Sequence, residues 1–397
     1  MRRAMSKQIK RAVAGLALIP LLAVLLSGCW DNEELHTLYI VTGMALDKAV
    51  DPEQMDITVQ IAKSQSKETS GPDGSGSQGH SVILLQTTRS TMMEGLMDLN
   101  QNSNRHLLRQ HNKVLLLGSE LAEQGIRNHI DLFMRNRESR MEVLVMVVQG
   151  RAEDALYANL EQDTISAMFL SNMIKELSQI SQQYMIRMLD FSSRFLEETT
   201  APLAPLIQVS GEEDKQEIRI IGLAVFKEDK MIGRLNPEEM LGYMWTMGKV
   251  KESSMAANTD LGKAAFQIIH INSKREVELR QDGGVQVALD VDARMRISEL
   301  HGFGQTDVKD LIPYLTEAAK EEIRQRIIDT FEEARELNAD IYGFGTSVYR
   351  KYPKEWKTMK ERWDEIYPDI QLDVQVDVQI PGTGQIVQSV EMEVNRP

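Results

Sequence analysis

The feature that most constrains the fold is a run near the end of the chain in which every second residue is apolar. This run, Val285–Ile297, has the period-two pattern of a strand with one buried face. The turn signal Gln281-Asp282-Gly283-Gly284 precedes it and predicts a hairpin with an earlier strand, Phe266–Arg280. A later segment, Leu372–Ile380, alternates in the same way. We therefore expect an antiparallel sheet with one solvated face.

One long helix is expected to cover the apolar face of this sheet. Between Leu311 and Leu337, apolar residues recur every three to four positions, which is the spacing of one helix face. The turn Gly343-Phe344-Gly345 is expected to stop this helix. An antiparallel sheet packed on a long helix predicts an α+β domain over residues 256–397.

Two further units are expected before this domain. Residues 29–205 alternate strand-like with helix-like segments, which predicts a mixed α/β domain, and Met141–Val148, apolar on both faces, is expected at its centre. Thr199–Pro205 contains two prolines and marks a boundary. Residues 206–255 read as a hairpin and a helix that begins at Asn236-Pro237. The expected fold class is thus α+β, with three mixed α/β domains of which the middle one is small.

The first residues have the pattern of an export signal. Several basic residues and no acid precede Ala12–Leu26, an apolar run shorter than the roughly 20 residues of a membrane-spanning helix. Leu26-Ser27-Gly28-Cys29 then resembles a bacterial lipobox, and Cys29 is the single cysteine of the chain. We expect a signal peptide over residues 1–28, cleavage between Gly28 and Cys29, and both S-diacylglycerol and N-acyl groups on Cys29. The alternative is an ordinary secretory signal with an incidental cysteine.

Such acyl groups would hold the mature protein on the outer face of the cell membrane. The formal charge of the 397-residue chain is −14, which does not suit contacts to nucleic-acid phosphates. We therefore expect attachment to the membrane through the lipid anchor, and no binding of nucleic acid.

Catalytic motifs are missing from the sequence. There is no nucleophile elbow, no zinc-binding histidine pair on a helix and no phosphate-binding loop. The local S-x-x-K match, Ser64 to Lys67, lies in the Ser- and Gly-rich segment Ser64–His80, which is expected to be a flexible strand connection rather than a lid. His106 and His111 have no acid–base partner in the pattern. We expect no enzyme activity and no cofactor.

Two pairs of carboxylates stand on single strand faces. Asp290 with Asp292, and Asp373 with Asp377, could bind a divalent cation through oxygen. A solvated sheet face is the simpler interpretation, and we expect no metal.

Three blocks of sequence together resemble the Ger(x)C family of spore germination lipoproteins. The blocks are Cys29-Trp30-Asp31 with Val41–Asp47, then His111–Gly118, and then Asp340–Gly345 with Tyr349-Arg350-Lys351 and Tyr367-Pro368. They lie in order along essentially the whole mature chain, and the resemblance is looser at Ser64–His80.

The resemblance implies assembly and signalling rather than catalysis. Family members are lipid-anchored C subunits of nutrient germinant receptors, with a multi-spanning B subunit and an A subunit, in the inner membrane of a dormant spore. It implies three mixed α/β domains and gives Cys29 as the one defined chemical site, and we do not expect this chain to bind the nutrient directly. A solute-binding lipoprotein of a membrane transporter is the alternative, and it would need two doubly wound parallel lobes. An anchored envelope hydrolase is disfavoured by the missing motifs.

Overall fold

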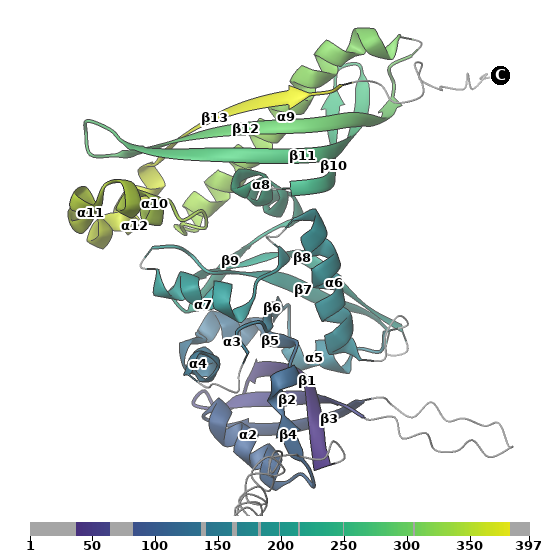
Figure 1. The fold of residues 1–397 in the computed structure, drawn as a ribbon, viewed down its shortest axis with the longest axis vertical. Helices are drawn as coiled ribbons and strands as arrows, with labels where there is room; N and C mark the ends of the chain where they lie inside the picture. Colours follow the sequence, from purple (N-terminus) through teal and green to yellow (C-terminus); the bar gives the residue numbers. More distant parts are fainter. Residues whose placement is uncertain are drawn as a thin grey trace, which may run out of the picture.

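The computed structural model describes residues 37–63, 82–135, 140–160, 165–181, 184–197, 199–212, 215–248, 250–304 and 306–381. Over these residues the chain forms two β-sheets, which are stacked along the long axis of the molecule (Figure 1). The predicted lipidation and cleavage sites, Cys29 and Gly28, and the segment Ser64–His80 lie outside the described residues.

The first sheet is mixed and has nine strands. The strands are β1 (Leu38–Lys48), β2 (Met55–Ala62), β3 (Val82–Arg89), β4 (His106–Leu108), β5 (Val114–Gly118), β6 (Leu144–Val148), β7 (Leu203–Glu212), β8 (Lys215–Lys227) and β9 (Lys230–Leu235). They lie in the order β3-β2-β1-β5-β6-β7-β8-β9, with β4 beside β1. The run from β1 through β5 and β6 to β7 is parallel, and the strands that flank it pair antiparallel. The strand predicted at the centre is β6, which is buried along its whole length.

Helices cover both faces of this sheet. One face carries α2 (Met92–Gln101), α3 (Ser119–Gln124), α4 (Arg127–Arg135) and α7 (Met188–Leu196), and the other carries α5 (Ala152–Tyr157) and α6 (Ser166–Ile180). In β5, Leu115 packs in the first cluster with Phe133, whereas the next residue, Leu116, packs in the second with Leu170. Burial on both faces explains why the central strands are apolar throughout.

The strands β7, β8 and β9 continue the first sheet. The sequence pattern instead predicts a separate small middle domain over residues 206–255. Leu203 and Leu223 belong to the core of the second half of the molecule, whereas Ala204 and Phe226 pack on the side of α7. The sequence of β8 and β9 therefore has the pattern of an independent hairpin, but its buried side chains belong to the cores of the two halves. The predicted boundary after residue 205 falls inside β7.

The second sheet has four strands in the order β10-β11-β12-β13. They are β10 (Val250–Thr259), β11 (Gly262–Leu279), β12 (Val285–His301) and β13 (Gln371–Gln379). The predicted β11–β12 hairpin is confirmed, with Gly283 in the left-handed region at φ 83°. The expectation of an all-antiparallel sheet is wrong for one pairing, because β13 runs parallel to β12. The helical connection between the two strands returns the chain to the end of the sheet where β12 began, and a parallel pair requires such a crossover.

The long helix α9 (Val308–Glu336) lies across this sheet as predicted. Its apolar stripe is buried, including Leu315, Ile323, Ile327 and Phe331. The shorter helix α8 (Pro237–Met247) packs on α9, and Asn236 caps it by accepting hydrogen bonds from the N–H groups of its first turn. The α+β class inferred from the sequence is confirmed.

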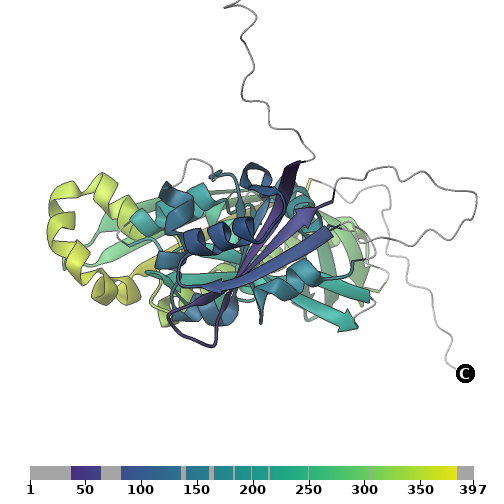
Figure 2. The ribbon, with the colours of Figure 1, turned by 90° about the horizontal axis from the view of Figure 1, so that it is seen from below.

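The chain between α9 and β13 forms a cluster of short helices. They are α10 (Phe344–Lys351), α11 (Pro353–Met359) and α12 (Trp363–Ile366), with the 3₁₀ turns η4 (Lys360–Arg362) and η5 (Tyr367–Asp369); a further 3₁₀ turn, η2 (Arg109–His111), lies in the first half. Figure 2 shows this cluster projecting to one side of the stack. The expectation that Gly343 stops α9 is wrong: α9 ends at Glu336, where Asn338 takes the left-handed backbone at φ 46°, and Gly343 instead precedes α10.

Candidate functional site

The two halves of the molecule meet at Asp340, in the loop between α9 and α10. Its backbone lies beside Thr200 in a parallel bridge, and its carbonyl oxygen accepts a hydrogen bond of 2.9 Å from the N–H of Ala201. Thr200 lies three residues before β7, the first of the strands that the two cores share. A segment of the second half is thus attached directly to the end of the first sheet.

The side chain of Asp340 is buried, with 3% of its surface exposed. Its carboxylate oxygens accept hydrogen bonds from the N–H groups of Phe344, at 2.9 Å, and Gly345, at 2.8 Å. These N–H groups open α10 and have no partner within the helix. Burial raises the pKa of Asp340 to about 6, against the opposing effect of the backbone N–H groups and of the nearby Arg194 charge.

Arg194 connects three segments at the same junction. It comes from α7, and its guanidinium donates to the carbonyl oxygens of Ala201, at 3.0 Å, and Ile341, at 3.1 Å. It also donates to the hydroxyl of Tyr243 in α8, at 2.8 Å. Planar guanidinium groups suit several acceptors at fixed angles, so this residue holds the loop, the shared strands and α8 in one arrangement.

Aromatic rings pack beneath this polar layer. The rings of Tyr342 and Phe344 are stacked with centroids 5.1 Å apart, and Phe331 of α9 lies 6.2 Å from each. Arg275 of β11 donates to the carbonyl oxygen of Tyr342, at 3.3 Å, and burial lowers its pKa. The junction is therefore a packed interface as well as a hydrogen-bonded one.

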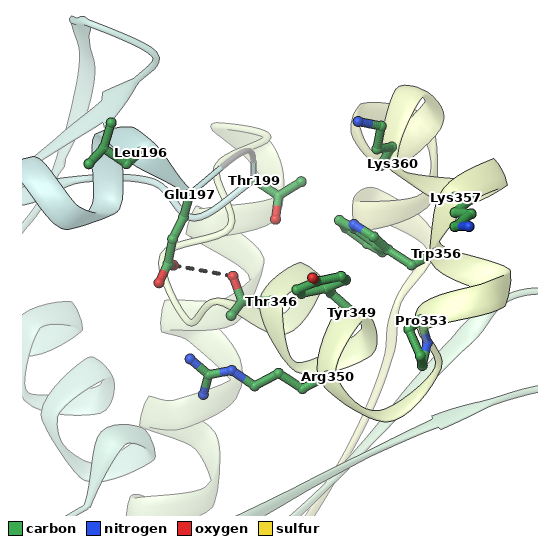
Figure 3. A pocket seen from close by; sticks show the side chains of 10 residues that line it. All are labelled: Leu196, Glu197, Thr199, Thr346, Tyr349, Arg350, Pro353, Trp356, Lys357 and Lys360. Atoms are coloured by element: carbon green, nitrogen blue, oxygen red, sulfur yellow. Dashed lines mark hydrogen bonds between the residues drawn. The ribbon is translucent and has the colours of Figure 1, made fainter.

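A groove of about 540 Å³ opens beside the junction, between the end of α7 and the helices α10 and α11 (Figure 3). Its lining residues are Leu196, Glu197, Thr199, Thr346, Tyr349, Arg350, Pro353, Trp356, Lys357 and Lys360. Thr346 donates a hydrogen bond of 3.2 Å to the Glu197 carboxylate and lies 3.1 Å from the hydroxyl of Thr200, so α10 is fixed to the first half here. A Cβ on Gly345 would approach the Trp356 ring to 2.9 Å and also meet the Thr199 hydroxyl.

The carboxylates that the sequence offered as cation ligands come together no more than in pairs within the described residues. Asp292 and Asp377 are opposite each other across β12 and β13 on the exposed face. His106 and His111 are both exposed, one in β4 and one in η2. Within the described ranges, no group of three or more His, Cys, Asp or Glu side chains is placed to hold a metal ion.

The chemistry at the junction is that of a structural contact. The Asp340 carboxylate accepts one backbone hydrogen bond at each oxygen and so fixes the first turn of α10. No sequence pattern indicates that Asp340 lies near Arg194, because the two residues are far apart along the chain. A weak signal existed in the pattern of an aspartate followed by glycine and a new helix, because short polar side chains favour helix N-termini.

Two family models match the two parts of the chain. The model described as "Spore germination protein N-terminal domain" matches residues 31–209, and the one described as "Spore germination B3/ GerAC like, C-terminal" matches residues 221–384. Together they take in most of the chain, including both sheets and the junction.

Similar proteins agree with these matches. Spore germination protein KC of Bacillus subtilis strain 168 is 26% identical over 396 residues, covering 93% of this chain and 95% of its own. Protein YfkR of the same strain is 24% identical over 389 residues, covering 96% of this chain and all of its own. The crystal structure of the GerBC protein has the same fold, with a TM-score of 0.57 and 18% identity over 89% of this chain and 100% of that one.

These likenesses define the class as spore germination proteins. Within that class, this chain belongs to the Ger(x)C family. No helix among the described residues is long and apolar enough to span a membrane.

Proposed function

We propose that this chain is the lipid-anchored C subunit of a nutrient germinant receptor. Cys29 carries the anchor, and the protein body lies on the outer face of the cell membrane and, after sporulation, at the inner membrane of the spore. There it assembles with the membrane-embedded A and B subunits and takes part in signalling that starts germination. The observation that carries this proposal is family membership over both halves of a chain whose single cysteine ends a lipobox.

The junction supports an assembly role over a catalytic one. The buried Asp340 carboxylate bonds to the backbone of α10, and the half-buried Arg194 of the first half bonds to Ile341 and Tyr243 of the second. A body with a fixed arrangement of its two halves presents a constant surface to partner subunits, which lowers the ordering cost of assembly.

The anchor is tested by replacing Cys29 with alanine in the full-length chain and labelling cells with a clickable fatty acid. We expect the variant to incorporate no label and to keep its signal peptide, because the thiol is the acyl acceptor. Ser27→Ala serves as the matched control, since it keeps a small residue before Cys29 and should remain labelled. Label on the alanine variant would contradict the lipobox interpretation.

The receptor role is tested by deleting the gene and measuring spore germination with a panel of nutrients. We expect one class of nutrient to lose its effect, and an epitope-tagged chain from spore membranes to co-purify with A and B subunits. Unchanged germination with every nutrient, together with no co-purification, would contradict the proposed function.

A further inference from the structure

Large apolar side chains of the groove in Figure 3 are exposed to solvent. Leu196 is 74% exposed and Tyr349 is 55% exposed, and they stand on opposite sides of the groove. Trp356 and Pro353 also belong to the lining, beyond Tyr349 as seen from Leu196. Single exposed apolar residues are normal on a protein surface, but a hollow lined by several of them is typical of a docking site.

Basic side chains surround these apolar side chains. From residue 350 to 360 the sequence holds five basic residues and one acidic residue, in a chain whose net charge is −14. Arg350 and Lys357 line the groove, are exposed, and form no ion pair with any residue in the described ranges. Figure 3 shows the rings of Tyr349 and Trp356 lying between Arg350 and Lys360. The local charge is thus opposite to that of the whole protein.

The walls of the groove are held in place without a ligand. The Thr346–Glu197 and Thr200–Thr346 contacts join its two sides, and Gly345 lets α10 approach Thr199 closely. The Trp356 ring is supported edge-on by Trp363, with centroids 5.2 Å apart. A preformed groove binds a partner at a smaller entropic cost than one that must first be ordered.

We propose that this groove docks an acidic, amphipathic segment of a partner protein in the receptor. An aliphatic or aromatic side chain of that segment would lie between Leu196 and Tyr349, and its carboxylates would face Arg350 and Lys357. This inference rests on the proposed function and assigns the surface through which the subunit contacts its partner. A second copy of this chain fits less well, because two bodies of net charge −14 repel each other.

The groove is tested by placing the photo-cross-linking residue p-benzoylphenylalanine at position 349 of the full-length chain in spores. Tyr157, which is 51% exposed in α5, provides the matched control position. We expect irradiation to give an adduct at position 349 with a different protein, mapped to a peptide rich in Asp and Glu, and no such adduct at position 157. An adduct with residues 382–397 of the same chain, with a second copy, with lipid, or with nothing would overturn the proposal.

Charge reversal then tests the role of the cations. Arg350→Glu with Lys357→Glu should reduce the adduct about tenfold, because two attractive contacts become repulsive. Arg294→Glu with Arg296→Glu, on the exposed face of β12, should leave the adduct unchanged. Both double variants should keep the melting temperature of the parent, since the four side chains are exposed. An adduct that survives reversal of the groove charges would overturn the proposal.

The two proposals can fail separately. If deletion of the gene abolishes a nutrient response while the groove variants still assemble normally, the receptor role stands and the groove assignment falls. If deletion changes no nutrient response and no partner co-purifies, the receptor role itself falls.

Discussion

Asp47 and Asp340 are two buried carboxylates that do the same chemical work in different places. Asp47 ends the apolar stretch of β1 and accepts hydrogen bonds from the N–H groups of Ala152 and Glu153 at the start of α5, at 2.6 and 3.0 Å. Asp340 does the same for α10. The two side chains are 2% and 3% exposed, and burial raises the pKa of each to about 6.

The difference lies in what each carboxylate connects. Asp47 ties one strand of the first sheet to a helix on its face, and the neighbouring Arg151 side chain is 46% exposed. The Asp340 carboxylate bonds within the second half, to the first turn of α10, while the backbone carbonyl oxygen of the same residue accepts a hydrogen bond from Ala201 of the first half and the Arg194 charge lies nearby. One carboxylate therefore holds a strand and a helix of the first half together, whereas the other holds the loop whose backbone joins the two halves.

The largest effect is expected from removing the ring on which the Asp340 loop packs. Phe331→Ala should lower the free energy of unfolding by about 3–5 kcal/mol, since it leaves a cavity beneath Tyr342 and Phe344. Denaturant unfolding of the chain from residue 30 onward measures it. The neighbouring Glu332→Ala, on the exposed side of α9, should stay within about 0.5 kcal/mol. Equal, small effects at both positions would show that the stripe of α9 is not buried.

The comparison itself is tested by removing each carboxylate in turn. Asp340→Ala should cost about 3 kcal/mol, because it leaves two buried N–H groups unpaired and Arg194 without a nearby negative charge. Asp47→Ala should cost about 1–2 kcal/mol, the range for losing a helix cap, because the neighbouring Arg151 keeps its ion pairs with Asp56 and Glu153. The same denaturant titration compares the two variants. A larger loss at Asp47 would reverse the order that we infer.

A smaller effect should follow from adding one methyl group at the junction. Gly345→Ala should cost about 1–3 kcal/mol, because the new Cβ meets Thr199 and the Trp356 ring across the contact between the halves. Lys354→Ala, on the exposed part of α11, should change the unfolding free energy by less than about 0.5 kcal/mol. If the alanine at position 345 were neutral, the two halves would not be in close contact there.

The smallest effect concerns pH. Because burial raises the pKa of Asp340 from 3.8 to about 6, the folded protein binds this proton more readily than the unfolded chain does. The contribution of the group to stability is then greatest below about pH 4 and falls as the pH rises through about 6. The stability of the parent relative to Asp340→Asn should fall by about 1 kcal/mol between pH 5 and pH 7. A relative stability that rises with pH would mean that Arg194 and the backbone N–H groups outweigh burial.

Sequence pattern predicts the second sheet and its helix well, because their information is local. The buried side of each element can be read from its own sequence: from the alternation in Val285–Ile297 for β12, and from the spacing of Leu315, Ile323 and Phe331 for α9. The lipobox at Cys29 is equally local, and it stays a prediction.

The sequence pattern does not predict which other element packs against the buried side of a strand or helix. Leu203 and Ala204 are both buried, but in different cores, so the strands that join the two halves look like a separate domain. The alternation of apolar and polar residues in β13 also does not predict its direction, because the pattern is the same for parallel and antiparallel pairing. Asp340 and its partners lie far apart along the chain, and only the folded structure brings them together.

The strands shared by the two cores have a mechanical consequence. A hinge needs a segment that can change its backbone angles without disturbing packed side chains, but β7 and β8 are packed from both sides by different halves. Bending the molecule at this point would open two cores at once. We therefore expect the described body to move as one stiff unit, so that a displacement near β1 would also displace the groove at Tyr349.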